Sequence, residues 1–257
     1  MAISEVLDSQ EPISEVTEEY LRVQLAAAYR LVDHFGWAIG IYGHLTVRVP
    51  GTDPHFLINP FGLRYDEVTA SNLVKIDCDG NTIGRSDYPV NDAGFVIHSA
   101  IHMADSDNAC VMHTHTREGV AVSATKEGLQ MTCQEASAFY GRVSYHDYEG
   151  IALRLDERAR LVVDLGDNRQ MILRNHGLLT TGRTVPEAFL RLWMLQRCCE
   201  TQVDAGLAGT LNILSDDVAE VAYGDFNLDD PLRDDVGELE FSAWMRMLDK
   251  IDLSYRT

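Results

Sequence analysis

Two closely spaced histidines, and a third further along the chain, are the residues best suited to chemistry. His113 and His115 follow the short apolar run 110–112, which is typical of a buried strand. Side chains alternate between the two faces of a strand, so residues at i and i+2 point to the same side. His176 follows a second apolar run, 171–173. Three neutral imidazoles are a ligand set for a catalytic divalent metal with positions left open for water or substrate.

The same histidines could also be ordinary surface or structural residues, because a His-x-His pair by itself is a weak signal. Two observations favour metal binding. The pair follows the C-terminal end of an apolar strand, where α/β proteins tend to place their sites. In addition, His98 and His102 form a further pair on one face of an expected helix just upstream.

The composition is that of a globular protein with an acidic surface. The chain has 257 residues, of which 46% are hydrophobic and 24% charged, and its formal net charge is −19. This charge disfavours nucleic acid and anionic membranes as partners, because both bind clustered Lys and Arg. No apolar run reaches the roughly 20 residues that span a bilayer, and the acidic start of the chain is unlike a signal peptide. We therefore expect a cytoplasmic protein with a small-molecule substrate.

The pattern of apolar residues, caps and turns predicts an α/β chain in three parts. Residues 1–16 are polar and acidic and could be poorly ordered, residues 17–208 form the main domain, and residues 209–257 form an acidic, helical C-terminal extension. Thr184 and Glu187 form a capping box that begins a long helix. Other helices are expected near 17–35, 93–103, 118–125, 156–165 and 239–251. Strands are expected near 45–49, 56–58, 73–76, 82–83, 110–115, 171–174 and 178–181. Between the helix at 118–125 and residue 150 we expect mainly loops.

Five short motifs, taken in order, resemble those of the class II aldolase/adducin family. Each motif is modest alone, but their order and spacing are specific, and the resemblance extends from about Leu21 to Ala208. The motifs are Gly43-His44-Leu45-Thr46-Val47-Arg48, which is similar to the family's G-N-[IL]-[ST]-x-R; Asn59-Pro60-Phe61-Gly62; Asn91-Asp92-Ala93-Gly94-Phe95-Val96-Ile97-His98; His113-Thr114-His115-Thr116; and Arg174-Asn175-His176-Gly177.

The resemblance implies a fold, an assembly and a cofactor. The fold is a three-layer α/β/α domain with a mainly antiparallel central sheet. The assembly is a homotetramer with active sites at the subunit interfaces. The cofactor is one divalent metal per subunit (Zn, Mn or Fe(II)), held by the residues that match His113, His115 and His176, so the resemblance and the spacing of the histidines lead to the same three ligands.

Two departures from the family pattern bear on the substrate. Sugar-phosphate members have an acidic acid/base residue four positions before the histidine that matches His98, where this chain has Gly94. Asp92 is the nearest carboxylate, and it could be catalytic or simply a helix N-cap. The loop that binds phosphate in those members contains Pro60, which lacks an N–H, and the bulky Phe61. We therefore expect a non-phosphorylated, more apolar substrate, for which an aromatic compound is one candidate.

Several residues could bind such a substrate or move its protons. Asn59 and Phe61 are the expected contacts in the loop, and Arg48 or Arg64 could pair with a substrate carboxylate, although each could also be an ordinary structural or surface arginine. Candidate proton donors are Tyr140 and His98. For Tyr140 the alternative is packing beside the sheet, and for His98 it is a supporting role behind the ligands.

The sequence favours metal-dependent cleavage of a C–C bond. A divalent ion held by three neutral imidazoles acts as a Lewis acid on a carbonyl or on a chelating 2-oxo or hydroxy acid, and it stabilises the enolate shared by retro-aldol cleavage and decarboxylation. Decarboxylation needs no base to start, so the change to Gly94 harms it less than an aldolase reaction.

Two other functions remain open. The same ligands could hold iron in a non-haem Fe(II) oxygenase that carries out oxidative decarboxylation of an aryl 2-oxo acid. Alternatively, the domain could be a non-catalytic, adducin-like assembly module, although such a module would have no need of the three histidines. The sequence does not reveal the substrate, the metal, the use of oxygen or the general acid/base, nor whether the acidic C-terminal extension shapes the site.

Overall fold

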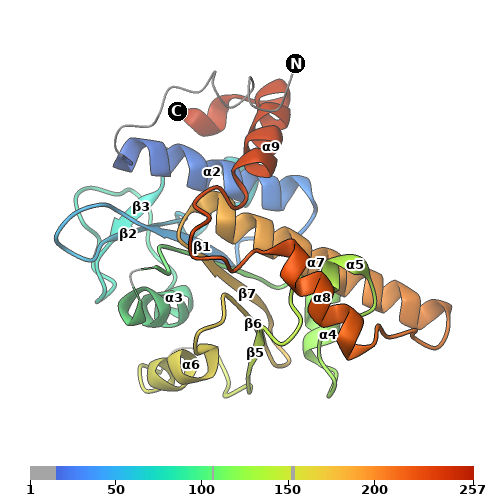
Figure 1. Ribbon diagram of the computed structural model, residues 1–257. Helices are drawn as coiled ribbons and strands as arrows, with labels where there is room; N and C mark the ends of the chain where they lie inside the picture. Colours follow the sequence, from blue (N-terminus) through green and yellow to red (C-terminus); the bar gives the residue numbers. More distant parts are fainter. Residues whose placement is uncertain (1–15, 106, 152–153) are drawn as a thin grey trace.

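A mixed sheet of seven strands runs through the middle of the protein (Figure 1). The structure is a computed structural model that describes residues 16–105, 107–151 and 154–257, so the expectation for residues 1–15 lies outside the described residues. The strands follow the spatial order β3-β2-β1-β4-β7-β6-β5, which places β4 at the centre. Their bounds are β1 His44–Arg48, β2 Phe56–Ile58, β3 Val74–Ile76, β4 Cys110–Thr114, β5 Val143–His146, β6 Gln170–Leu173 and β7 Gly177–Gly182.

The pairing of the strands confirms the expected mainly antiparallel sheet. Within the described residues only β5 and β6 pair in parallel, and every other neighbouring pair is antiparallel. In this register His113 of β4 lies opposite His44 of β1 on one side and opposite Leu179 of β7 on the other. The histidine strand is therefore fixed on both edges by backbone hydrogen bonds.

Helices cover both faces of the sheet, giving the three layers that the sequence predicts (Figure 1). α2 and α7 pack on one face, and α3 and α6 pack together on the other. The helices are α2 Glu18–His34, α3 Asp92–Ala104, α4 Arg117–Ser123, α5 Gln134–Ser137, α6 Glu157–Leu165, α7 Val185–Ala208, α8 Asp216–Phe226 and α9 Glu238–Ile251, with 3-10 turns η1 Tyr65–Glu67 and η2 Ser254–Arg256.

Alternation along β4 divides its side chains between two hydrophobic cores. Cys110 and Met112 pack in the larger core beneath α2 and α7, whereas Val111 packs in the smaller core beneath α3 and α6. Because side chains alternate, His113 shares the face of Val111. None of the helices among the described residues is long and apolar enough to cross a membrane.

The predicted cap of the long helix α7 is half confirmed. Thr184 Oγ1 accepts a hydrogen bond from the backbone N–H of Glu187 at 3.1 Å, as expected for the first half of a capping box. The carboxylate of Glu187, however, accepts from the backbone N–H of Arg183 at 3.0 Å rather than from Thr184. Glu187 therefore ties the end of β7 to the start of α7.

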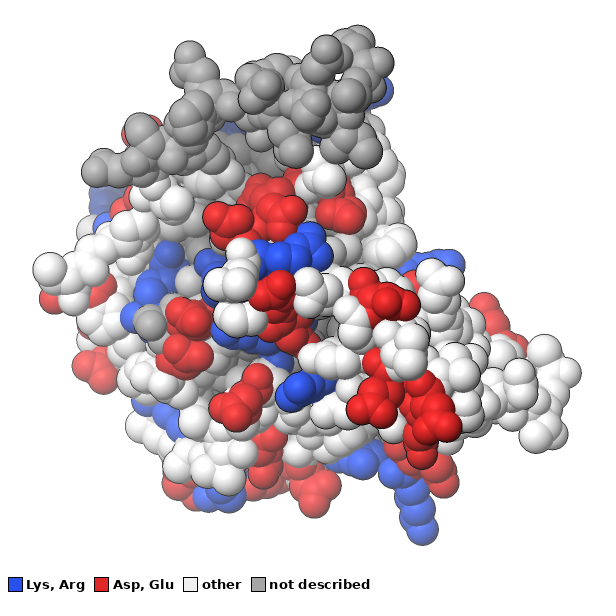
Figure 2. Space-filling model, viewed as in Figure 1, with Lys and Arg blue, Asp and Glu red and all other residues white. Residues whose placement is uncertain are grey.

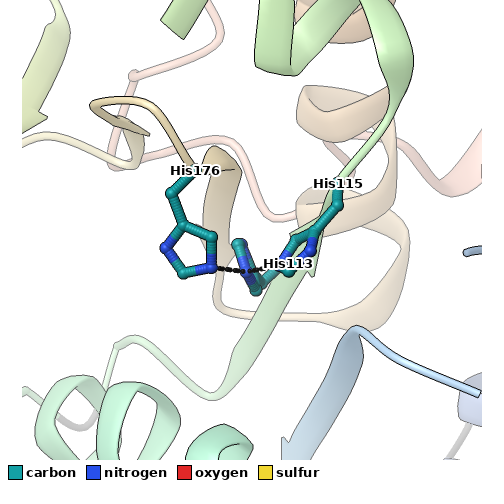
Figure 3. Close-up of side chains that lie close together, drawn as sticks. All are labelled: His113, His115 and His176. Atoms are coloured by element: carbon teal, nitrogen blue, oxygen red, sulfur yellow. Dashed lines mark hydrogen bonds between the residues drawn. The ribbon is translucent and has the colours of Figure 1, made fainter. Parts of the chain in front are cut away.

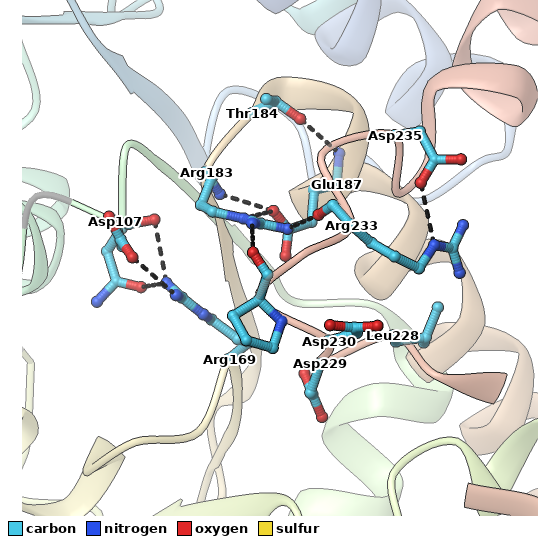
Figure 4. Close-up of polar contacts among 12 residues, drawn as sticks. Asp107, Arg169, Arg183, Thr184, Glu187, Leu228, Asp229, Asp230, Arg233 and Asp235 are labelled. Carbon is cyan, nitrogen blue, oxygen red and sulfur yellow. Dashed lines mark hydrogen bonds and ion pairs between the residues drawn. The ribbon is translucent and has the colours of Figure 1, made fainter. Parts of the chain in front are cut away.

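The C-terminal segment is packed against the main domain by arginines. Arg183 donates to the carbonyl oxygens of Pro231 and Arg233 (Figure 4). Arg191, only 1% exposed, forms ion pairs with Glu187 at 3.0 Å and with Asp229 at 2.8 Å. Figure 2 shows that many other carboxylates on this face lie at the surface, with arginines among them. We call residues 228–235 the arginine-bound segment.

Besides the two short 3-10 turns, three elements were not predicted from the sequence. β5 and α5 lie in the stretch before residue 150 that the sequence analysis assigns mainly to loops, and α8 lies in the extension without having been located there. β5 has only four residues, and its pairing partner β6 comes later in the chain, so its stability depends on tertiary contacts.

Candidate metal centre

Three imidazoles converge at the end of the sheet where β4 ends (Figure 3). His113 belongs to β4, His115 follows it directly, and His176 lies in the turn between β6 and β7. The Nε2 atoms of His113 and His115 are 2.7 Å apart, and those of His113 and His176 are 3.3 Å apart. The structure thus brings together all three predicted ligands, with one ligand atom of each within 4.8 Å of the others.

The turn that carries His176 needs unusual backbone geometry. Asn175 has a φ of 57°, in the left-handed region that asparagine tolerates better than most residues. Gly177 passes so close to β4 that a Cβ there would lie 2.3 Å from the carbonyl oxygen of Thr114. Only glycine permits this approach, and it brings His176 next to the histidines of β4.

Hydrogen bonds fix how the first two histidines are presented. His113 Nδ1 donates to the carbonyl oxygen of Leu178 at 2.8 Å, because a carbonyl can only accept. The lone pair of its Nε2 therefore faces the other two rings. His115 immediately precedes Thr116, whose Oγ1 caps α4 by accepting from the N–H of Gly119 at 3.1 Å. The backbone of His115 is thus held between β4 and α4.

The surroundings keep all three imidazoles neutral near pH 7. Burial, together with the nearby His176 and His115, holds the pKa of His113 well below its ordinary value. Burial also lowers the pKa of His115, and burial followed by the neighbouring His115 and His146 lowers the pKa of His176 to about 4. Neutral imidazole is the form that binds a metal.

These residues fit a divalent metal. A tetrahedral ion with nitrogen ligands at 2.0–2.1 Å spaces those ligands about 3.3 Å apart, which agrees with the distance between His113 and His176. The closer His113–His115 pair would have to open by about half an ångström. His115 and His176 are both partly exposed, so an ion here would retain access to solvent or substrate. The three side chains could therefore hold a divalent metal.

His98 lies behind the centre rather than within the ligand cluster. It is fully buried on α3, and its Nδ1 is 2.7 Å from Thr46 Oγ1. Both roles considered for His98 in the sequence analysis, proton donor and support behind the ligands, remain predictions. The side chain of Asp92 lies outside the described residues, although the backbone of Asp92 begins α3.

The structure does not bring Tyr140 to the three histidines within one chain. Its side chain faces α8, where desolvation and the neighbouring Asp216 carboxylate raise the pKa of its hydroxyl. A raised pKa makes the phenol a weaker proton donor. The catalytic role expected for Tyr140 therefore remains a prediction.

The loop expected to contact substrate follows β2, at the end of the sheet where β1 begins with His44. Phe61 is partly exposed there, with its ring centroid 6.5 Å from that of Tyr42. Asn59 is buried, and its Oδ1 and backbone N–H lie 3.0 and 3.2 Å from the Tyr29 hydroxyl. The substrate contact expected for Phe61 remains a prediction, whereas Asn59 connects β2 to α2.

The two arginines proposed to bind a carboxylate lie elsewhere. Arg48 ends β1, four residues beyond His44, and its backbone N–H bonds to Ala109 just before β4 begins. Four residues of strand span about 13 Å, so Arg48 is at the opposite end of β1 from the metal centre. Arg64 is exposed and forms an ion pair with Asp66 on the surface.

Sequence analysis missed a group of residues beside His176. The ring centroid of Tyr148 is 6.2 Å from that of His176, and the side chain is 53% exposed. Tyr148, His146 and Glu157 also line a small cavity that reaches His176. His146 is buried between two carboxylates, with Nδ1 2.7 Å from Asp164 and Nε2 3.5 Å from Glu157. Recognising β5 from the alternation over 143–146 would have identified this group.

The chain belongs to the family described as the Class II Aldolase and Adducin N-terminal domain, whose profile matches residues 23–203. It is similar to an aldolase II superfamily protein from Pseudomonas syringae, with 47% identity, a TM-score of 0.89 and coverage of 98% of this chain and 100% of that chain. It is also similar to L-fuculose 1-phosphate aldolase from Glaciozyma antarctica PI12, with 30% identity, a TM-score of 0.84 and coverage of 96% and 97%.

A third relative is longer than this chain. Alpha-adducin of Rattus norvegicus is 44% identical over 253 residues, which are 93% of this chain and 34% of that protein. The alignment with alpha-adducin extends well beyond the profile match at residues 23–203 and so takes in much of the C-terminal helical segment. Similarity to an aldolase and to an adducin supports two different functions, considered next.

Proposed function

We propose that this protein is a metal-dependent lyase that breaks a C–C bond, by decarboxylation or retro-aldol cleavage, in a non-phosphorylated 2-oxo or hydroxy acid. The convergence of the neutral His113, His115 and His176 side chains carries this proposal. A divalent ion bound there supplies Lewis-acid activation of a carbonyl or of a chelating acid. The similarity to L-fuculose 1-phosphate aldolase supports the same class of reaction.

Residues of this chain would select and orient the substrate. Phe61 and Tyr42 present aromatic surface on the loops at this end of the sheet, which suits an apolar or aromatic group. Pro60 offers no N–H for a phosphate. The ring of Tyr148 packs beside that of His176, so we assign to its phenol the delivery of a proton to the carbon left after C–C cleavage.

We also propose that the active protein is a homotetramer with its active sites at subunit interfaces. Tyr148 lies beside His176, Ile151 and Leu155 follow it in the chain, and all three are more than half exposed in the single chain. Large apolar side chains beside a site are typical of a surface that another molecule covers. Light scattering should give the mass of four chains, and a monomeric mass would contradict the assembly.

An adducin-like assembly role is the second candidate function. The similarity to alpha-adducin extends over 93% of this chain and favours it. A purely structural module does not require three neutral imidazoles that converge on one point. We therefore rank the lyase function above the assembly role. The oxygenase alternative uses the same three histidines and is decided by the identity of the metal.

Metal analysis of the whole protein, purified anaerobically without added metal, is the first test. Near-stoichiometric zinc or manganese together with deuterium exchange into pyruvate, followed by NMR, is the result expected for a lyase. Near-stoichiometric iron with oxygen uptake on aryl 2-oxo acids would replace it by the oxygenase. Failure to bind zinc, manganese or iron even after reconstitution would leave the assembly role.

A further inference from the structure

Two buried histidines beside the metal centre have hydrogen-bonding atoms without partners in the described part of the chain. His44 begins β1 and lies opposite the ligand His113 in the sheet register. His98 comes from α3, and the two rings meet edge to face with centroids 5.8 Å apart. The Nδ1 of His44 and the Nε2 of His98 are both buried and have no hydrogen-bond partner. Unpartnered buried polar atoms are costly and call for an explanation.

A chain of hydrogen bonds settles which ring nitrogen of His98 carries the proton. His102 Nδ1 lies 2.9 Å from the carbonyl oxygen of Asn108, which can only accept, so His102 Nδ1 is protonated and its Nε2 is an acceptor. Thr46 Oγ1 lies 2.7 Å from that Nε2 and must donate its single hydrogen there. Thr46 can therefore only accept from His98 Nδ1, also at 2.7 Å. Neutral His98 is left with a bare lone pair on Nε2.

The same reasoning shows that His44 offers a hydrogen-bond donor where His98 offers an acceptor. Asn91 Nδ2 lies 3.0 Å from His44 Nε2, and an amide nitrogen has only hydrogens to offer. The Nε2 of His44 therefore accepts, and the proton of its neutral ring is on Nδ1. Side by side, His44 presents a donor and His98 presents an acceptor.

We propose that His44 and His98 form a subsite for a hydroxyl group of the substrate, with His44 Nδ1 donating to it and His98 Nε2 accepting from it. This inference rests on the proposed function of the metal centre. A hydroxyl group donates and accepts at once, whereas ionised carboxylates and phosphates only accept and are repelled by the lone pair of His98. Water has the same two capacities, and a substrate hydroxyl would take over its place. The subsite narrows the substrate to an acid that carries a hydroxyl group near its metal-binding oxygens.

Neutron diffraction from deuterated crystals tests the assignment of the protons. Deuterium on Nδ1 and none on Nε2 is expected for His44, His98 and His102. Deuterium on Nε2 of His44 or of His98 would overturn the subsite. If it is found on one of them, both rings present donors or both present acceptors; if it is found on both, the donor and the acceptor exchange places.

Calorimetry on the zinc-loaded protein tests the ligand. Pyruvate and 3-hydroxypyruvate offer the metal the same carboxylate and 2-oxo groups and differ only in a hydroxyl. We expect wild-type protein to bind 3-hydroxypyruvate about tenfold more tightly. His98→Asn keeps the donor to Thr46 but removes the Nε2 acceptor, and His44→Gln keeps an acceptor for Asn91 but removes the Nδ1 donor. Each should reduce the preference to about twofold or less, while the exposed control His34→Gln keeps it.

The outcomes separate the subsite from the metal function. If both acids bind with equal affinity to wild-type protein, or if neither binds, the subsite is wrong, and zinc content measured on the same sample shows whether the metal centre stands. If wild-type protein binds neither zinc nor manganese nor iron after reconstitution, both proposals fail. A preference that survives unchanged in His98→Asn and His44→Gln would also overturn the subsite, because the metal alone would then account for it.

Discussion

The Nδ1–H of His113 donates a 2.8 Å hydrogen bond to the carbonyl oxygen of Leu178, one residue past the glycine that closes the β6–β7 turn. This bond joins the strand that carries His113 and leads directly into His115 to the hairpin that carries His176. It also fixes the tautomer, so that Nε2 of His113 faces His115 and His176. The position of His113 and its tautomer are therefore set by the same contact.

Replacement of His115 by alanine should abolish stoichiometric metal binding and leave the fold intact. Two imidazoles hold a divalent ion far less well than three, so metal content should fall from near one ion per chain to less than about a tenth. Mass spectrometry of dialysed protein measures this. His34→Ala, at an exposed histidine on α2, is the matched control and should keep its metal. Unchanged metal in His115→Ala would refute the ligand assignment.

Replacement of Tyr148 by phenylalanine should lower turnover without loss of metal. The ring stays beside His176 but loses its hydroxyl, and removal of a proton-transferring group typically reduces kcat by about 10²–10⁴-fold. Deuterium exchange into pyruvate by the metal-loaded protein is the assay. Tyr140→Phe is the comparison, because Tyr140 faces Asp216 instead. A loss confined to Tyr140→Phe would restore the role that the sequence suggests for that residue.

The sequence predicts the ligands but not the residues around them, for a physical reason. His113, His115 and His176 could be found because apolar runs mark strands and because strand side chains alternate. Tyr148 was missed, because the alternation that marks β5 covers only four residues and the strand is stabilised by pairing with a strand that comes later. Arg48 fits a family motif, yet only the sheet register shows that it lies at the opposite end of β1 from the metal centre. Local pattern thus identifies faces and ends of strands, whereas the neighbours across space depend on topology.

Removal of the Arg191 guanidinium should destabilise the protein strongly. Arg191 is buried between Glu187 and Asp229, and its loss leaves the buried carboxylate of Glu187 without this partner. Breaking a buried pair in this way costs about 3–5 kcal/mol of the free energy of unfolding. Urea unfolding of Arg191→Ala measures the change. The exposed pair of Arg197 and Glu200 offers a control, since Arg197→Ala should change the free energy of unfolding by less than about 1 kcal/mol.

Acid should destabilise the protein through buried His102. Burial, and secondly the charge of Arg48, lower the pKa of His102 from its ordinary 6.5 to about 3. Between these values the unfolded chain takes up a proton that the folded protein does not, so stability falls as the pH falls below about 6.5. For this residue the loss at pH 5 is about 2 kcal/mol.

Urea unfolding at pH 7.5 and at pH 5.0, in wild-type protein and in His102→Gln, isolates this contribution. The variant should lose less stability between the two pH values than wild-type protein does, whatever its stability at pH 7.5. An equal loss in both proteins would show that His102 does not titrate on unfolding in this range, and that other buried histidines such as His98 carry the acid sensitivity.

The arginine-bound segment has a consequence for where the cooperative folding unit ends. The family profile stops at residue 203, but the guanidinium of Arg191, inside that profile, has a charge partner at Asp229, outside it. Tyr255 is also buried, and its carbonyl oxygen accepts from the N–H of Ala70. A polypeptide cut after residue 208 would therefore keep every family motif and still lack contacts that its own interior requires. The region matched by the family profile and the packed domain of this protein therefore have different boundaries.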